Sequence, residues 1–229
     1  MNRTQWAAVT AVVLAVLFAG AATVASAVGD GGGGDGTSDT PTASSADAGF
    51  ARDMSVHHQQ AVEMSFIVRD RTEDEEIRRL AYDVANTQAN QRGMMLGWLD
   101  LWGLPKLSAG SEPMAWMSGS GGGEHAGHGG ADQVGQPAPA EDGVLMPGMA
   151  SRADLARLGK AGGKQAEIEY LQLMITHHNG GITMAEGCAK LCTVDTERKL
   201  AQGMVDAQRS EVDLMVDLLR KRGAEARTD

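Results

Sequence analysis

The strongest constraint on the fold of this chain is a repeated pattern of methionine and paired histidine. Met54–Met64 contains His57-His58, Met174–Met184 contains His177-His178, and the two stretches lie 120 positions apart in the 229-residue sequence. On a helix, which turns about 100° per residue, the Met and His positions of each stretch fall within an arc of roughly 120°. Each stretch therefore predicts a helix that carries two thioethers and two imidazoles on one stripe.

The same offset extends beyond the two motifs. The recurring pairs are Asp47 with Glu167, Phe50 with Tyr170, Leu80 with Leu200, Gln88 with Gln208, Gln91 with Glu211, and Met95 with Met215. Each repeat is expected to form a helical hairpin, and a single hairpin cannot bury its own apolar stripe. The sequence therefore predicts an all-α protein in which two repeated hairpins pack into a four-helix bundle.

Apolar residues at three- and four-residue spacing predict four long helices and one short one, and no run alternates as a strand would. The expected bounds are about 47–70, a second helix from a Thr72–Glu75 capping box to near Gly103, a short helix from Ser151 to about Ala161, and then about 164–190 and 194–222. The first hairpin repeat thus covers residues 47–104 and the second covers 146–222. Residues 105–145, between them, are rich in Gly, Met and His and are expected to be a linker.

Residues 1–28 have the features of an export segment. Arg3 precedes a nearly continuous apolar run from Trp6 to Ala22, and Ala25–Ala27 fits a cleavage site. Because the apolar run also approaches the thickness of a bilayer, both a cleaved signal peptide and a retained membrane anchor are open. Residues 29–46 are mostly Gly, Asp, Ser, Thr and Pro and are expected to be a flexible linker. We expect an extracytoplasmic protein, either secreted or anchored to the outer face of the cytoplasmic membrane.

The charge and the cysteines narrow the possible partners. The net charge of −10 argues against nucleic-acid binding, which needs clustered Lys and Arg for phosphate contacts. Cys188 and Cys192, the two cysteines, are four residues apart, a spacing that suits a disulfide in an oxidising compartment. A role as metal thiolates is the alternative.

All six histidines fall in three clusters: the two pairs in the repeats, and His125 with His128 in the linker. One histidine on an inner helix face is usually a hydrogen-bonded core residue, but two pairs flanked by methionine at one offset favour a binding site. Four further methionines lie in Gly-rich or Pro-rich segments where we expect no core for them to fill: Met114, Met117, Met146 and Met149. With His125 and His128 they are expected to form a flexible accessory metal site.

The donor atoms select the metal. Thioether sulfur is a poor ligand for Mg, Ca, Mn or Fe and a good one for Cu(I), whereas imidazole accepts both Cu(I) and Cu(II). Copper is therefore the expected ion, with silver as its chemical mimic and zinc possible at the histidine pairs alone. Polar residues on the inner faces of the second helix of each hairpin are candidates to support the ligands from behind: Gln88, Gln91, Gln208 and Glu211.

Two other functions remain open. A di-iron oxidoreductase would place Glu and Glu-x-x-His on four facing helices, but the chain contains no Glu-x-x-His, and Glu63 becomes Thr183 in the second repeat. A helical interaction module would use the stripes only for packing and dock onto an envelope partner. No catalytic constellation is found, because GxSxG and CxxC are absent and the Gly runs lack the Lys of a phosphate loop.

The paired motifs, together with Met146-Pro-Gly-Met149 before the second copy, resemble those of the bacterial domain-of-unknown-function family 305. The resemblance covers about residues 47–99 and 146–219. It implies a ferritin-like bundle, export and, for some members, periplasmic copper binding and copper tolerance. Carried over by position, it implies one ligand set: Met54, His57, His58, Met64, Met174, His177, His178 and Met184.

The leading hypothesis is thus an exported, non-enzymatic protein that binds copper for buffering, transfer or tolerance at the cell envelope. A copper-handling envelope protein is a possible partner, and the oligomeric state is left open.

Overall fold

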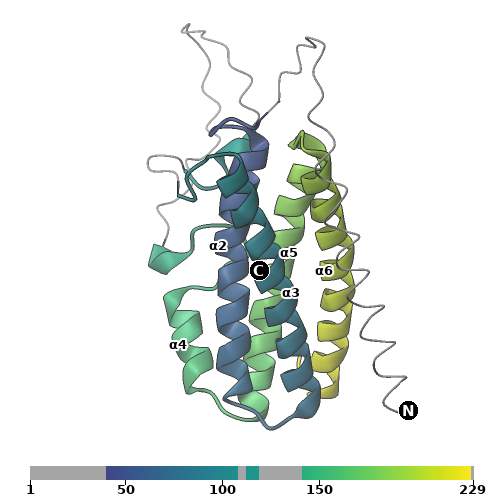
Figure 1. Cartoon of the computed structure of the whole chain (residues 1–229). Coiled ribbons are helices and arrows are strands. Elements are labelled where there is room, and N and C mark those ends of the chain that lie inside the picture. Colours follow the sequence, from purple (N-terminus) through teal and green to yellow (C-terminus); the bar gives the residue numbers. More distant parts are fainter. Residues whose placement is uncertain (1–39, 108–111, 119–140, 228–229) are drawn as a thin grey trace, which may run out of the picture. The chain divides into compact units, whose positions relative to one another are not determined.

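The computed structural model describes residues 40–107, 112–118 and 141–227, and these residues form helices without any strand (Figure 1). The elements are α2 (Ala46–Arg69), α3 (Glu75–Leu101), η1 (Ala115–Ser118), η2 (Glu141–Gly143), α4 (Arg152–Lys160), α5 (Lys164–Leu191) and α6 (Asp195–Lys221). The predicted all-α class is confirmed. The expected export segment, the linker up to residue 39, and both His125 and His128 lie outside the described residues.

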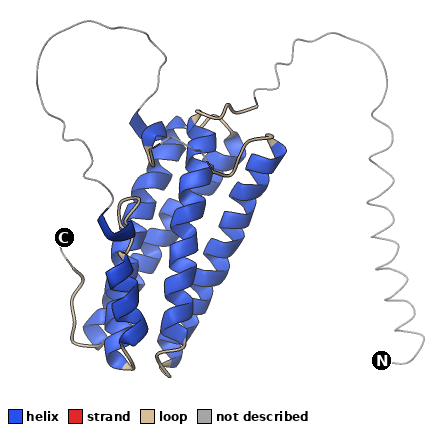
Figure 2. Cartoon of the chain, turned by 90° about the vertical axis from the view of Figure 1, so that its left-hand side faces the viewer, coloured by secondary structure: helices blue, strands red, loops and turns tan. Residues whose placement is uncertain are grey.

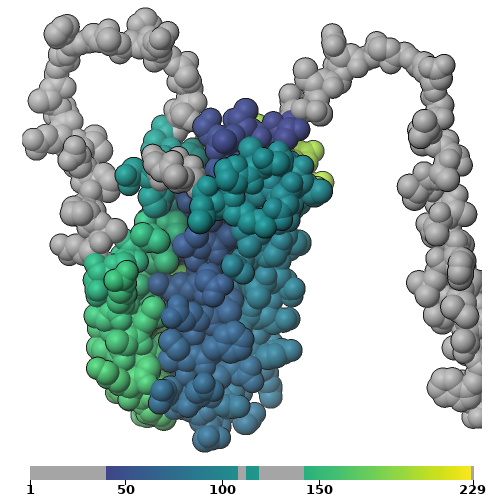
Figure 3. All heavy atoms as spheres, turned by 60° about the vertical axis from the view of Figure 1, so that its left-hand side comes forward, coloured from purple at the N-terminus to yellow at the C-terminus, as the bar shows by residue number. Residues whose placement is uncertain are grey.

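The four long helices form two hairpins, one of α2 and α3 and the other of α5 and α6 (Figure 2). The hairpins meet through α2 and α5, and α4 packs on both of these helices at one side (Figure 3). α3 and α6 begin and end at positions that differ by 120 residues, so the duplication seen in the sequence is also present in the fold.

The buried apolar residues form two separate clusters. The lower cluster, as we call it, lies near the α2–α3 turn and includes Val68, Ile77 and Leu171. The upper cluster lies near the α5–α6 turn and includes Phe50 and Leu99. Between them along the helices is a buried polar layer of His57, His58, Gln88, His177, His178 and Gln208. The histidine stripes therefore interrupt the apolar core instead of extending it.

The helix starts agree with the sequence in one case and not in another. Ser151 and Asp154 form a reciprocal capping box at the start of α4. The expected Thr72–Glu75 box is wrong, because Asp74 is the N-cap residue of α3 and its side chain accepts from the Ile77 N–H. The Thr72 hydroxyl instead donates to Glu167 on α5, at 2.6 Å. Thr72, which the local sequence pattern predicted to cap α3, thus binds a residue of another helix instead.

The loop before α4 presses closely on α5. A Cβ atom at Gly180 would lie 2.1 Å from the Pro147 carbonyl oxygen, and one at Gly148 would lie 2.5 Å from the Thr176 carbonyl oxygen. Gly148 also has a positive φ of 80°, which favours glycine. Only residues without a side chain allow this approach.

None of the helices in the described part of the chain combines the length and hydrophobicity that crossing a bilayer requires.

We expect Gly180→Ala to lower the free energy of unfolding, because the added methyl group would collide with the Pro147 backbone; overpacking of this kind costs about 1–3 kcal/mol. Gly203→Ala on α6 is the matched control. A Cβ there meets nothing within 4 Å, so replacing a helical glycine should stabilise the protein by up to about 1 kcal/mol. Urea unfolding followed by circular dichroism measures both. Equal stability of the two variants would contradict the close approach.

Candidate metal centre

The two histidine pairs meet at the contact between the two hairpins. His57 on α2 and His177 on α5 have ring centroids 3.8 Å apart and planes inclined by 31°. The His178 ring centroid is 6.5 Å from that of His177. All four imidazoles are buried, with at most 1% of each residue exposed. Two motifs separated by 120 positions in sequence therefore lie in one layer of the bundle.

The second histidine of each pair binds a side chain on the outer helix of its own hairpin. His58 Nε2 lies 2.8 Å from Gln91 Oε1 on α3, and His178 Nε2 lies 2.7 Å from Glu211 Oε2 on α6. Because a carboxylate only accepts, the His178 Nε2 carries the proton; an amide oxygen imposes the same tautomer on His58.

The first histidine of each pair binds a backbone carbonyl group. His57 Nε2 donates to the Pro147 oxygen at 3.3 Å, and His177 Nε2 donates to the His57 oxygen at 3.1 Å. A carbonyl oxygen cannot donate, so both rings also carry their proton on Nε2. The Met146–Met149 loop thus orients one of the imidazoles.

The other ring nitrogen of each histidine is unused. Within the described residues, the Nδ1 atoms of His57, His58, His177 and His178 are buried and have no hydrogen-bond partner. In the neutral form of each ring Nε2 holds the proton, so Nδ1 presents a lone pair. The polar layer therefore holds four imidazole rings whose Nδ1 atoms have no hydrogen-bond partner, with the opposite nitrogen of each ring fixed by a hydrogen bond, as in metal-binding histidines.

Burial keeps three of these imidazoles, those of His57, His58 and His177, neutral. Desolvation is the main cause that lowers the pKa of His57 to about 4 and that of His58 to about 3. Desolvation, followed by the nearby charges of the other three histidines, lowers the pKa of His177 well below its usual value. A neutral imidazole is the form that binds a metal ion.

The eight expected ligands are divided among three layers. Met54 and Met184 are fully buried in the upper cluster, and Met64 and Met174 are fully buried in the lower cluster. Within each motif, one methionine precedes the histidine pair and the other follows it along the helix. Each motif therefore contributes one methionine to the upper cluster and one to the lower cluster. The structure brings the His57 and His177 rings into contact, with His178 next to His177, and places the thioethers in the apolar clusters above and below them.

Two glutamines that we expected to support the ligands lie in the same layer. Gln88 is 3% exposed, and its side-chain nitrogen and oxygen have no partner within the described residues. Gln208 occupies space beside α5 that a side chain at Gly181 would need, since a Cβ there would lie 2.6 Å from Gln208 Oε1. Gly181 therefore makes room for an amide in the second repeat, where the first repeat has Ala61.

The expectation that the linker methionines have no core to fill is wrong for the four that the structure describes. Met146 is 4% exposed and belongs to the upper cluster, and Met114, Met117 and Met149 pack against that cluster. For Met114 and Met117 the reason is a long-range anchor: Asp53 Oδ2 on α2 accepts from the Met114 N–H at 2.8 Å and from Trp116 Nε1 at 3.0 Å. Trp116, a buried aromatic residue inside a Gly-rich segment, was the sequence signal for this contact.

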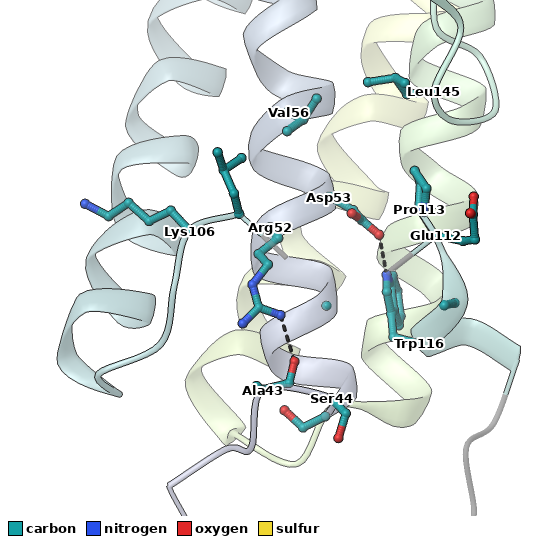
Figure 4. Close-up of a pocket in the computed structure, with 14 residues that line it drawn as sticks. Ala43, Ser44, Arg52, Asp53, Val56, Lys106, Glu112, Pro113, Trp116 and Leu145 are labelled. Atoms are coloured by element: carbon teal, nitrogen blue, oxygen red, sulfur yellow. Dashed lines mark hydrogen bonds between the residues drawn. The ribbon is translucent and has the colours of Figure 1, made fainter. Parts of the chain in front are cut away.

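A pocket of about 480 Å³ opens near the N-terminal half of α2, lined by residues that include Arg52, Asp53 and Trp116 (Figure 4). The four histidines are not among its lining residues. The pocket therefore does not coincide with the polar layer. Cys188 and Cys192, close to the upper end of α5, are joined by a disulfide.

Comparisons with known proteins agree with this architecture. The model of a domain of unknown function, DUF305, matches residues 47–219. A DUF305 protein from Streptomyces coelicolor that was assigned as secreted is 57% identical, with 82% of this chain and 100% of that chain covered and a TM-score of 0.69. A DUF305 fragment from Deinococcus radiodurans is 27% identical, with 77% and 96% covered and a TM-score of 0.57. CopM in a Cu(I)-bound form is 19% identical, with 76% and 96% covered and a TM-score of 0.53, and so shares the fold. No curated protein sequence matches the chain.

The low pKa values predict how stability depends on pH in the absence of metal. The pKa of His57 falls from 6.5 to about 4 on folding, so the unfolded chain binds more protons between these values. The free energy of unfolding should be at its full value above pH 6.5 and fall as the pH drops towards 4, with a slope of up to about 1.4 kcal/mol per pH unit from this residue. His58→Gln should reduce the total slope in urea unfolding at a series of pH values. A wild-type stability that stays constant from pH 7 to about 4.5 would contradict neutral, buried imidazoles.

Proposed function

This chain belongs to the DUF305 family, and from that premise we propose that it is an exported, non-enzymatic protein that binds copper through its paired His–Met motifs. The observation that carries the proposal is the set of four buried Nδ1 atoms in the polar layer that have no hydrogen-bond partner. Bound copper would be buffered or passed on at the cell envelope, and the protein would thereby contribute to copper tolerance.

The unused nitrogen atoms argue for a ligand more strongly than burial does. A buried acceptor without a hydrogen bond costs roughly 1–3 kcal/mol, and the polar layer holds four at equivalent or adjacent positions. If the stripes served packing alone, apolar side chains at these positions would avoid that cost. An imidazole whose Nε2 is held by a carbonyl or carboxylate and whose Nδ1 is free is the arrangement of a metal ligand.

The nature of the donors favours copper among the possible ions. Imidazole accepts Cu(I) and Cu(II), and the motif methionines in the clusters above and below the polar layer add thioethers that suit Cu(I) or Ag(I). Zinc would use the imidazoles alone. CopM, which shares this fold at 19 to 22% identity, carries Cu(I) in one structure and Cu(II) in another, in agreement with such a donor set. Export is supported by residues 1–28 and by the secreted assignment of the Streptomyces relative.

Removal of the imidazoles or thioethers should weaken Cu(I) binding without unfolding the bundle. We expect His57→Ala with His177→Ala, and separately Met54→Leu with Met184→Leu, each to lose affinity by a factor of ten or more, since tenfold corresponds to only about 1.4 kcal/mol. The Leu replacements keep volume and remove sulfur. Met94→Leu, at a residue 44% exposed on α3, is the matched control. Competition with a Cu(I) chelator measures affinity, and circular dichroism checks the fold.

Unchanged Cu(I) affinity in the folded histidine variant would exclude the polar layer as the binding site. It would leave the helical interaction module as the remaining explanation for the buried stripes.

The two halves of the centre should differ in strength, because His178 binds the carboxylate of Glu211 where His58 binds the amide of Gln91. A carboxylate makes the imidazole a stronger donor, and changing such a partner typically alters metal affinity 10–100-fold. We expect Glu211→Gln to weaken Cu(II) binding by about tenfold and Gln91→Glu to strengthen it. Isothermal titration with a Cu(II) chelate measures both. Each variant introduces the residue that the other repeat already has at the equivalent position. If both variants changed the Cu(II) affinity in the same direction, the carboxylate of Glu211 would not be what strengthens binding.

A further inference from the structure

The two ends of the bundle are built on equivalent positions but carry different chemistry. At the lower end, the α2–α3 turn presents Val68, Thr72 and Ile77, and Glu167 reaches across from α5. Glu167 accepts from the Thr72 hydroxyl at 2.6 Å and from the Arg222 guanidinium at 2.7 Å. The buried carboxylate at this end is therefore neutralised by a cation.

At the upper end, the equivalent positions hold Cys188, Cys192 and Glu197, and Asp47 reaches across from α2. The position of Arg222 is taken by Trp102. Within the described residues, neither Asp47 nor Glu197 forms an ion pair with Lys or Arg. The upper end thus combines two sulfur atoms with two carboxyl groups, and no Lys or Arg of the described residues pairs with either carboxyl group.

Glu197 is the residue that packing does not explain. It is 0% exposed, its carboxyl group contacts that of Asp47, and within the described part of the chain no N–H or hydroxyl group donates to either of its oxygens. Asp47 Oδ1 is satisfied by the backbone N–H groups of Thr193 and Val194, both at 2.8 Å. Burial and the adjacent Asp47 raise the pKa of Glu197 to about 9, so at neutral pH Glu197 is an uncharged carboxyl group beside the Asp47 carboxylate. At the lower end, Ile77 fills the same position with an apolar side chain.

Glu197 and the two cysteines lie close enough to share one ion. One oxygen of Glu197 and the sulfur atoms of Cys188 and Cys192 all lie within 4.8 Å of one another, and all three residues are buried. We propose that, when the disulfide is reduced, Cys188, Cys192 and Glu197 form a second metal site, which takes a divalent cation of the zinc type and is separate from the histidine centre. Two thiolates and a carboxylate are ligands that zinc accepts, and the fourth position of a tetrahedral zinc site is open to a water molecule.

The chemistry balances with a dithiol as the reductant. The dithiol gives two electrons and two protons to the Cys188–Cys192 disulfide, becomes a cyclic disulfide, and leaves two thiols on the protein. The divalent cation then displaces the two thiol protons and the proton on Glu197. Cys192 directly follows the last residue of α5, so reduction needs only the α5–α6 turn to open, and helix ends open at lower free energy than the core.

Co²⁺ is the probe, because its thiolate complexes absorb by charge transfer from sulfur. The chain contains only two cysteines, so this absorption reports the upper site alone and is blind to histidine ligands. The full chain is reduced with dithiothreitol, freed of the reductant without oxygen, and titrated with Co²⁺. We expect one equivalent of Co²⁺ with the thiolate band in the reduced protein and no such band in the oxidised protein.

Two variants separate this site from a simple dithiol. Glu197→Gln should weaken Co²⁺ binding to the reduced protein by about tenfold or more, because even the loss of a residue that only orients a metal ligand typically lowers metal affinity by that factor. Cys188→Val with Cys192→Thr copies the lower end of the bundle and should abolish the band. The proposal is overturned if the reduced, folded protein shows no thiolate band, or if Glu197→Gln binds Co²⁺ as tightly as the wild type. It is equally overturned if reduction removes the helical circular dichroism and Co²⁺ does not restore it. None of these results depends on copper binding at the histidines.

Discussion

The contact between α2 and α5 at the level of His57 and His177 is the feature on which the rest of the structure depends. His177 donates to the backbone oxygen of His57 while the two rings pack against each other at 3.8 Å. Gly148 and Gly180 let the Met146–Met149 loop close over the same level, where Pro147 holds the His57 ring. A larger residue at either glycine would move the loop, the ring and the hairpin contact together.

The polar layer lowers the stability of the bundle. Continuous apolar stripes would join the upper and lower clusters into one core, whereas the observed layer leaves four Nδ1 atoms and the Gln88 amide without partners. Groups of this kind destabilise a fold unless something binds them. The same burial that makes the layer costly also keeps the imidazoles of His57, His58 and His177 neutral, and a neutral imidazole is the form that can accept a cation.

Duplication supplies a symmetric scaffold whose two halves have since diverged in chemistry. The helices of the second hairpin repeat those of the first, yet Gln91 is replaced by Glu211, Ala61 by Gly181, and Ile77 by Glu197. The two residues of each pair lie at corresponding positions of corresponding helices. The side chains therefore differ while the helical backbone is the same. The repeat therefore provides internal reference residues for both the histidine centre and the cysteine end.

The sequence by itself determined the helices, the 120-residue repeat and the inward stripes of Met54, His57 and their counterparts, because helical periodicity is a local property of the chain. Only the tertiary structure decided which groups meet. In the folded protein the Thr72 hydroxyl binds Glu167 instead of capping a helix, and the Pro147 carbonyl group binds the His57 ring. Met114 and Met146 pack in or against the upper cluster. The tertiary structure also placed Glu197, which looked like an ordinary first-turn carboxyl group, in a dry corner beside Asp47. Such pairings join residues that are up to 150 positions apart, and local pattern carries no information on how one hairpin faces the other.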